Sequence, residues 1–472
     1  MFSLLNLSLR NQLLLLVSLT GISRIPYIFD GYGVEEDSWG LVVNSYEIQQ
    51  TGHFVASRLP GHPVQEWTYA LIYDQPAWMY NSLSVLFSMI AVFYFFKVVH
   101  QLGLESPGLW TLAFACTPVF YIAGTYTIDY AWVLGFLLAS LYYLLRGHFI
   151  VSGILLGMTI GLRVTTGAFL LPWLLLVWNN LDTKTSIKHF LSIAVPAGLI
   201  GIAWYIPVYL VYGSGFFDYS DQFPYPPLTK ILYKASIGVF GLLGCIAIAY
   251  TLYCYVRRRK SFEWNGTNFI TPKQLVTVCL VVIGIHILAY LRLPQKSAYM
   301  LPLVPFVIIL CALVLQKREV KWFALLFAGA PFLMSMNLTD PLRGAEHSAL
   351  AATFKISGQE IFIDPISGPI FSERSKRINK MKYCDEVLKA TDTITLPTVI
   401  IGGWWYNELI TENFTRKYNK LVRHRFYIEC HVMDSARRAG AQVFYLPEQN
   451  LYNDQMYGQQ CTDSLAQPFY IR

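Results

Sequence analysis

The sequence predicts a polytopic α-helical membrane protein of about eleven transmembrane helices, followed by a small soluble α/β domain. Its 472 residues are 54% hydrophobic, 15% aromatic and only 14% charged, unlike the composition of a soluble protein. The apolar residues also gather in runs of about 20, the length that crosses a bilayer. After the last run, short apolar stretches alternate with polar helical ones, which predicts the α/β domain.

Apolar runs mark the expected spans. The run Phe149–Trp178 is too long for one upright helix, and we expect it to break into two crossings near Leu162–Thr166, with Arg163 at the join. The first run has no small-residue cleavage site, so we expect it to remain as a signal anchor. The other expected spans are Gln12–Phe29, Ala77–Val99, Leu109–Gly124, Tyr130–Leu145, Phe190–Tyr212, Ile231–Val256, Leu275–Leu291, Ala298–Leu315 and Trp322–Met336.

Charged residues predict the orientation of these spans, because Lys and Arg collect in cytoplasmic loops. With the N-terminus inside, residues 1–339 form the membrane domain, and the loop 30–76 and the tail 340–472 lie on the outer, periplasmic or luminal face. The net charge of +7 is spread among loops and predicts no nucleic-acid-binding surface. Basic loops hold Lys97, Arg146, Lys184, Lys188, Arg257–Lys260, Lys273 and Lys317–Lys321, and acidic loops hold Glu35–Asp37, Glu47, Glu66, Asp74, Asp129, Asp218 and Asp221.

The tail is expected to contain a mostly parallel sheet, with a helix at Val432–Ala439. Five of the eight cysteines lie in apolar runs, where we expect them to pack as small apolar residues. The other three, Cys384, Cys430 and Cys461, allow at most one disulfide among themselves. The expected strands are Glu360–Pro365, Thr398–Gly403, Arg425–Cys430 and Ala441–Pro447.

Three consecutive acids, Glu35–Asp37, open the polar stretch between the first two spans. Clustered carboxylates raise one another's pKa, and a positioned carboxylate can take a proton from an attacking hydroxyl group. Asp37 is therefore a candidate catalytic base or metal ligand, with Glu35 and Glu36 as further candidates, and the simpler alternative for Asp37 is a helix N-cap. We expect an interfacial helix here that ends at Gly52. Its apolar face would contain Trp39, Val42, Val43 and Tyr46.

The rest of this outer loop offers His53, Arg58, His62 and Glu66 as candidates for contact with an acceptor or substrate. The two histidines and the arginine could also meet a phosphate or a metal, although two histidines nine residues apart do not make a metal site on their own. No cofactor is assigned. A divalent cation stays open, with Asp37 and Asp129 as its ligands if one binds.

Charged residues at the ends of later spans form a second set of candidates. Asp129 begins a span, where an acid is either functional or an N-cap. Arg163 lies within a long apolar stretch, and it either snorkels to the surface or binds a phosphate at the expected break. Arg292, Lys296 and Tyr299 stand between two spans, where they either anchor the chain in the interface or bind a lipid phosphate.

Four segments, in order, resemble motifs of the GT-C class of membrane glycosyltransferases, which includes protein O-mannosyltransferases and lipid A aminoarabinose transferases. EEDSW with TGHFVASRLPGHPVQE is similar to the acidic loop and the TGxxxxSRxPGxPxxE stretch of some bacterial members. Thr127–Asp129 is similar to a TxD signal. GILLGMTIGLRVTTG is similar to GLLLGLxxLTRPT, with Val164 where Pro is frequent. RLPQKSAYMLPLVP is similar to RxPRYLLPLLP, with Gln295 and Lys296 in place of the basic–aromatic pair.

The resemblance implies an integral-membrane glycosyltransferase that moves a sugar, with inversion, from a polyprenyl-phosphate donor to a lipid, glycan or protein acceptor on the outer face. By this analogy Asp37 would be the base, Asp129 would shape the site or bind a cation, and Arg163 and Arg292 would hold the donor phosphate. We expect a bacterial inner membrane rather than the endoplasmic reticulum. Two other functions stay open, a transporter or flippase of lipid-linked sugars, which usually shows repeat symmetry, and a non-catalytic scaffold subunit of the same fold.

Overall fold

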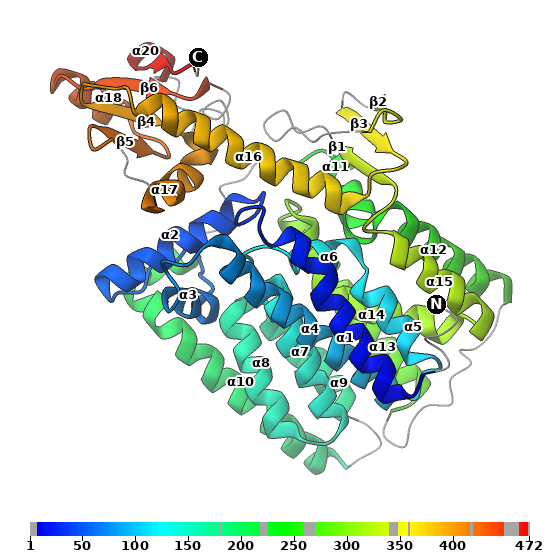
Figure 1. The fold of residues 1–472 in the computed structure, drawn as a ribbon. Coiled ribbons are helices and arrows are strands. Elements are labelled where there is room, and N and C mark those ends of the chain that lie inside the picture. The colour runs from blue at the N-terminus through cyan, green and yellow to red at the C-terminus, as the bar shows by residue number, and fades with distance from the viewer. Residues whose placement is uncertain are drawn as a thin grey trace.

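A computed structural model of the chain shows a body of packed helices with the tail on one side of it (Figure 1). It describes residues 7–178, 182–217, 225–258, 270–338, 348–356, 359–415, 419–447 and 462–470. Asp218, Asp221, Arg259, Lys260 and Cys461 lie outside these ranges. The helices of the body, 3-10 turns included, are α1 (Leu9–Arg24), η2 (Ile25–Tyr27), α4 (Ala77–Gln101), α5 (Pro107–Ala115), α6 (Pro118–Ala123), α7 (Tyr130–Leu145), α8 (Phe149–Leu162), η3 (Val164–Phe169), α9 (Leu170–Val177), α10 (Thr183–Tyr212), η4 (Gly213–Phe217), α11 (Leu228–Ala235), α12 (Ile237–Arg258), α13 (Pro272–Arg292), η5 (Ser297–Leu303), α14 (Val304–Val314) and α15 (Lys317–Gly329).

The composition of these helices is that of a multi-pass membrane protein. Five stretches in the described part of the chain are long and apolar enough to cross a bilayer, and three shorter helices are also apolar. Leu199, Ile202 and Leu210 on α10 are at least 66% exposed, which suits a lipid environment and not water. The number of about eleven spans stays a prediction. The long stretches are Ala77–Gln101, Thr183–Phe216, Ile237–Arg258, Pro272–Arg292 and Ser297–Val314, and the shorter ones are Tyr130–Leu145, Phe149–Leu162 and Val164–Val177.

The long apolar run breaks at Arg163, as predicted. The helix α8 ends at Leu162, and η3 begins at Val164 after one residue of extended backbone. A Cβ atom on Gly153 of α8 would lie only 2.4 Å from the carbonyl oxygen of Ile193 on α10. Because glycine has no side chain, the two helices can approach this closely. This packing holds the helix whose end presents Arg163.

Several predicted spans differ from the observed helices, among them Ile231–Val256, which is divided between α11 and α12 at Ser236. The run Leu109–Gly124 is divided between α5 and α6, because α6 begins at a proline, which cannot donate the hydrogen bond that would continue α5. The end predicted for Trp322–Met336 is wrong. The helix α15 stops at Gly329, two residues before Pro331, and β1 (Ser335–Leu338) follows as a strand.

The outer loop folds into α2 (Glu36–Thr51) and α3 (Pro63–Ala70). As predicted, α2 ends at Gly52. This glycine has a left-handed backbone (φ 69°), and its N–H donates to the carbonyl oxygen of Ile48. The N-cap is Glu35, so Asp37 is the second residue of the helix. Acids in this first turn are stabilised by the positive end of the helix dipole. Trp39 and Val42 are buried as expected, Val43 and Tyr46 are only half-buried, and the buried face also includes Ser38, Leu41, Ser45 and Ile48.

Two sheets form from the strands of the tail, and one of them also includes β1, which lies just before residue 340. An antiparallel sheet has the strand order β1-β3-β2, and a parallel sheet has the order β5-β4-β6-β7. Thr398 at the start of β4 pairs with Val422 on one side and Gln442 on the other. The elements of the tail are β2 (Ala352–Ile356), β3 (Gln359–Asp364), α16 (Pro369–Thr391), β4 (Thr398–Ile401), η6 (Gly403–Trp405), α17 (Tyr406–Thr415), β5 (Val422–Arg425), α18 (Cys430–Arg438), β6 (Gln442–Tyr445), α20 (Thr462–Leu465) and β7 (Gln467–Pro468).

One predicted tail strand forms in a different sheet from the one expected, and another is wrong. The prediction puts Glu360–Pro365 in the parallel sheet, but β3 is the middle strand of the antiparallel one, where it pairs with its sequence neighbour β2. In place of Arg425–Cys430, the strand is Val422–Arg425, in which two buried residues alternate with two exposed arginines. Three of these four side chains are basic or titratable, so the sequence does not show the alternation of apolar and polar residues by which a strand is recognised. Among the tail cysteines, Cys384 is a buried free thiol and Cys430 is disulfide-bonded.

Candidate active site

The carboxylate of Asp37 is held by two cations. Asp37 forms ion pairs with Arg58, from the loop after α2, and with Lys296, from the segment between α13 and η5. Lys296 Nζ also lies 2.6 Å from Glu35 Oε2, and the hydroxyl group of Tyr126 donates to Glu35 Oε1 over 3.3 Å. The four charged side chains are only 22–24% exposed. Segments far apart in sequence therefore meet around the first-loop acids.

A second, deeper ion pair joins Asp129 and Arg163. Asp129 precedes α7 and is fully buried, whereas Arg163 lies at the break between α8 and η3 and is 14% exposed. The guanidinium group binds both carboxylate oxygens, with Nη2 3.0 Å from Oδ1 and Nε paired with Oδ2. Its Cζ atom lies 4.1 Å from the ring centroid of Tyr130 and 5.6 Å from that of Tyr299. Two aromatic rings and a bidentate pair thus hold the guanidinium group in one orientation.

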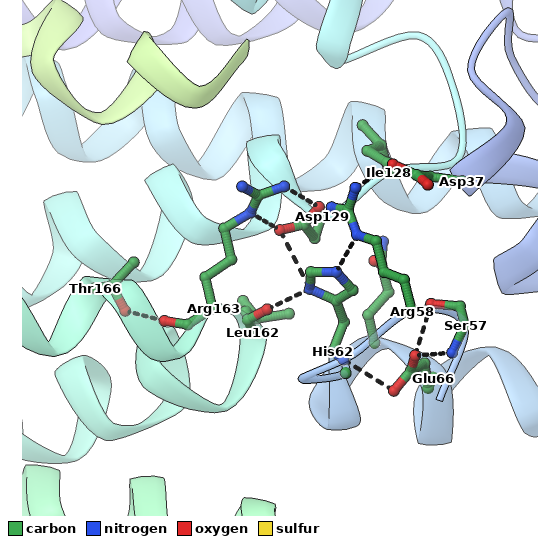
Figure 2. Close-up of polar contacts among 12 residues, drawn as sticks. Asp37, Ser57, Arg58, His62, Glu66, Ile128, Asp129, Leu162, Arg163 and Thr166 are labelled. Atoms are coloured by element: carbon green, nitrogen blue, oxygen red, sulfur yellow. Dashed lines mark hydrogen bonds and ion pairs between the residues drawn. The ribbon is translucent and has the colours of Figure 1, made fainter. Parts of the chain in front are cut away.

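The two ion pairs are joined by His62, as Figure 2 shows. The Nε atom of Arg58 donates to His62 Nε2 over 3.0 Å, and His62 Nδ1 lies 2.7 Å from the carbonyl oxygen of Leu162 and 3.6 Å from Asp129 Oδ2. His62 is 6% exposed. We use the name ion-pair cluster for Glu35, Asp37, Arg58, His62, Asp129, Arg163 and Lys296.

The loop that carries Arg58 and His62 is braced by Glu66 of α3. One carboxylate oxygen of Glu66 accepts from the backbone N–H and the hydroxyl group of Ser57, both at 2.7 Å, and the other accepts from the backbone N–H of His62 at 2.9 Å. Gly61, between the two anchor points, has φ +89°, a conformation that glycine adopts without strain. One side chain therefore sets the spacing between the two cluster residues of this loop.

The surroundings of these groups shift their pKa values. Burial acts to raise the pKa of Asp37, but the positive charges of Arg58 and Lys296 outweigh it and hold that pKa well below the usual range. Burial lowers the pKa of His62 to about 4, against the influence of Asp129. At neutral pH three cations then face three carboxylates around a neutral imidazole, so the charges of the ion-pair cluster cancel.

Most of the predicted site residues meet in this region, and some do not. Asp37, Arg58, His62, Asp129, Arg163 and Lys296 belong to the ion-pair cluster, Tyr299 lies beside Arg163, and Glu66 lies under the loop. Glu36 is the half-buried first residue of α2, the side chain of His53 is exposed, and Arg292 is exposed at the end of α13. The chemical roles assigned to all of these residues stay predictions.

The simpler alternatives are wrong for Asp37 and Arg163, and the one for Asp129 holds in position but without a side-chain cap. Asp37 does not precede its helix, and Asp129 stands at the N-cap position of α7 without a side-chain capping hydrogen bond. Both carboxylates are instead engaged by cations. Arg163 does not extend to the surface, because its guanidinium group is paired with a buried acid.

Several residues of the site give little signal in the sequence. Tyr130, which stacks on Arg163, reads as an ordinary apolar residue of a span. Asn81 of α4 is buried and donates to the carbonyl oxygens of Ile28 at 2.7 Å and Gly31 at 2.9 Å, while its own oxygen accepts from Thr127 at 2.8 Å. Asn81 therefore connects the segment before Asp37 with the segment before Asp129 through hydrogen bonds. A lone asparagine in the run Ala77–Val99 is the only sign of this role among the described residues of that run.

The residues of the site do not fit a divalent cation. In the described ranges, no group of three or more His, Cys, Asp and Glu side chains converges in the way that a metal needs. Asp37 and Asp129 face separate cations, and the Arg58–His62 pair stands between them. The two carboxylates therefore pair with cationic side chains and do not gather around one point.

Comparison with protein-family models and with curated proteins finds no match for this chain. A solved structure does match it, the crystal structure of ArnT from Cupriavidus metallidurans bound to undecaprenyl phosphate. The chain is similar to ArnT. The identity is 15% and the TM-score is 0.45, over 65% of this chain and 61% of the ArnT chain, which is less than two thirds of its length. At this TM-score, the likeness to ArnT assigns no activity by itself.

Proposed function

We propose that this protein is an integral-membrane glycosyltransferase that transfers a sugar from a polyprenyl-phosphate donor to an acceptor. The observation that carries the proposal is the ion-pair cluster, in which Asp37 is linked through Arg58 and His62 to the Asp129–Arg163 pair. It combines a candidate base with cations for a phosphate, beside apolar helices. A lipid-linked donor cannot leave the bilayer, so its reactive group must meet the protein in such a place.

Lys296 and Arg58 are suited to a phosphate because each is held by a carboxylate that a phosphate can replace. An anionic donor that draws Lys296 or Arg58 toward itself leaves Asp37 with less positive charge nearby. The pKa of Asp37 then rises toward its ordinary value, and the carboxylate becomes a better proton acceptor. Donor binding thus activates the base. Arg163 keeps its bidentate partner and offers its remaining N–H groups to the phosphate.

The reaction balances with the groups present. The acceptor oxygen or nitrogen forms a bond to the anomeric carbon, while the bond from that carbon to the phosphate oxygen breaks. Asp37 takes the acceptor proton, and the polyprenyl phosphate leaves with one more negative charge, which the cations stabilise. The negative charge that Asp37 loses equals the charge that the phosphate gains, so the net charge of the site is constant. A single displacement of this kind inverts the anomeric configuration.

The proposal includes the number of spans, the side of the membrane on which the loop 30–76 and the tail lie, and the kind of membrane. About eleven spans would place the loop 30–76 and a domain from residue 340 to residue 472 on the outer face, and the sequence motifs favour a bacterial inner membrane. The contacts that support a common side join the opening loop to the tail, such as the 3.0 Å ion pair of Asp30 and Arg374. The acceptor is a lipid, a glycan or a protein, and His53, which is exposed, would contact it from the water side.

Sugar transfer by Asp37→Asn tests the proposal. Purified protein in proteoliposomes is given polyprenyl-phosphate mannose or aminoarabinose with a labelled sugar, together with membrane and periplasmic acceptor fractions. We expect labelled product from the wild type and a loss of about 10²–10⁴-fold in the variant, the usual contribution of general base catalysis. The matched control is Glu47→Gln, an exposed acid ten residues later on α2.

Other outcomes of this assay would contradict the proposal. Equal transfer by Asp37→Asn and wild type would remove Asp37 as the base. Label that crosses the bilayer without a covalent product would indicate a transporter or flippase. A wild-type protein that binds donor and does neither would indicate a scaffold subunit.

A further inference from the structure

One face of α16 in the tail contacts both of the loops that carry the site's acids. Arg374, Arg377 and Lys380 follow one another at a spacing of three residues and therefore lie along one side of the helix. We call these three residues the α16 ridge. In Figure 1, α16 runs across the end of the helical body, next to the start of α2 and the end of α1. Most hydrogen bonds from the ridge to the body reach backbone carbonyl oxygens of the segments that precede the acids of the ion-pair cluster, so the ridge would act through the backbone.

Arg377 connects η2, which precedes the first loop, with the segment before Asp129. Its Nη1 donates to the carbonyl oxygens of Tyr27 and Thr125, both at 3.2 Å, and its Nη2 donates to the hydroxyl group of Thr125 at 2.9 Å. Its Cζ atom lies 5.0 Å from the ring centroid of Tyr126, whose hydroxyl group donates to Glu35. Arg377 is 1% exposed. One tail side chain thus spans the gap between the segment before Asp37 and the segment before Asp129.

Of the two segments that lead to the site's acids, Lys380 is seen to contact the first loop. Its Nζ donates to the carbonyl oxygen of Val34 at 2.9 Å and pairs with Glu408 of α17, and both of these side chains are no more than 2% exposed. The same ammonium group lies 5.9 Å from the ring centroid of Trp39, two residues after Asp37. A buried lysine is costly unless it is paired, so these partners hold it in place. Val34 is followed directly by Glu35, the N-cap residue of α2.

We propose that the α16 ridge makes the tail a positioning element of the active site, with Arg377 and Lys380 as positioning residues for Asp37 and Asp129. This inference rests on the proposed glycosyl transfer for its kinetic consequences. It assigns the tail a role in holding the catalytic acids, in place of acceptor recognition or simple stability. Because the contacts differ, the two residues should differ in effect. Lys380 should position only the base, whereas Arg377 should position the base and the Asp129–Arg163 pair that meets the donor.

Kinetics of Lys380→Met and Arg377→Gln test this inference in the full-length protein. We expect Lys380→Met to lower kcat about tenfold or more with an unchanged KM for the donor, since misplacing a catalytic group slows the chemical step. Arg377→Gln should lower kcat and raise the donor KM. The matched control is Lys382→Met on the same helix, whose side chain is 75% exposed. Kinetic constants equal to the control in both variants would overturn the inference, as would identical effects of the two variants on donor KM.

Hydrogen–deuterium exchange of the same proteins in detergent provides a readout that needs no activity. We expect faster exchange in residues 27–35 for both variants and in residues 125–128 for Arg377→Gln alone, with β4 and β6 unchanged. Unchanged exchange in both segments would overturn the inference even if sugar transfer is found. Conversely, a wild type that transfers no sugar refutes the proposed function, while exchange still decides whether the ridge holds the loops.

A charge exchange covers the case in which Arg377→Gln or Lys380→Met does not fold. Arg374 is partly exposed and pairs with Asp30 at 3.0 Å. We expect Asp30→Arg and Arg374→Asp each to speed exchange in residues 27–35, and the double variant to restore it toward the wild-type rate. A double variant no better than the single variants would contradict the ridge as a contact that positions the loop.

Discussion

Arg58 donates to His62 through one hydrogen bond of 3.0 Å, from its Nε atom to the Nε2 atom of the imidazole. Because Nε2 accepts, the proton of the neutral ring is on Nδ1, which faces the carbonyl oxygen of Leu162 at 2.7 Å. The same Leu162 ends α8 immediately before Arg163. The position of the Arg58 guanidinium group, beside Asp37, therefore depends on the end of α8. The same helix end positions the guanidinium group of Arg163.

Arg163→Lys should weaken donor binding although it keeps the charge. Lysine cannot reproduce the bidentate contact with Asp129 or the stacking on Tyr130. Hydrogen bonds to charged groups contribute about 1.5–3 kcal/mol, so we expect the donor KM or Kd to rise about 10–100-fold. Binding of polyprenyl phosphate, measured by thermal shift, checks this against Arg146→Lys, an exposed arginine at the end of α7. Equal affinities would argue against Arg163 as a donor contact.

Lys296→Met should move the acid limb of the pH–rate profile to higher pH. Two cations hold the pKa of Asp37 below its ordinary value, and the variant removes one of them. The pKa of Asp37 should rise, so the carboxylate is protonated, and inactive as a base, at a higher pH than in the wild type. The kcat/KM profile reports this shift in the free enzyme. A limb that stays in place or moves to lower pH would contradict the assignment.

His62→Gln should flatten the pH dependence of stability in mild acid. The pKa of His62 is lowered to about 4 in the folded protein and is about 6.5 in an unfolded chain. Between these values the unfolded state binds a proton that the folded state does not, so stability falls as the pH is lowered from about 6.5 to about 4. Melting temperatures across this window should fall less for the variant than for the wild type. His100→Gln, an exposed histidine on α4, is the control and should keep the wild-type slope.

Ser57→Ala and Glu66→Gln should be strongly non-additive. Glu66 accepts two hydrogen bonds from Ser57 and one from the backbone of His62. Each single change should cost about 1–3 kcal/mol of stability or the corresponding loss of transfer, because a buried polar group loses a partner. The double variant should be only slightly worse than the more damaging single one. Strict additivity would show that Glu66 does not act through this loop.

The sequence predicts the helical body well, because runs of apolar residues are what a bilayer requires. It also locates the break at Arg163, since the run from Phe149 to Trp178 exceeds the length of one span. The strand at Val422–Arg425 cannot be predicted in the same way. Its buried positions include His424, and a polar residue on the inner face conceals the alternation by which strands are identified.

The candidate site can be predicted as a set of residues but not as a set of contacts. Charged residues are rare at the ends of apolar runs, and those that occur there stand out in the sequence. They include Asp37, Asp129, Arg163 and Lys296. Their pairing depends on how helices far apart in the sequence pack, which no local pattern encodes. For the same reason Arg377 gives no signal, because on α16 it looks like any other arginine of a charged helix.

The contact between Lys296 and Glu35 joins residues that are 261 positions apart. Chains are made from the N-terminus onward, so both first-loop acids are released from the ribosome long before their lysine exists. During that interval Arg58 is the cation from the early chain that can neutralise Asp37. The site is therefore completed only when the segment after α13 has been inserted. A chain truncated before this segment would contain Glu35 and Asp37 but would lack Lys296, the cation that pairs with both.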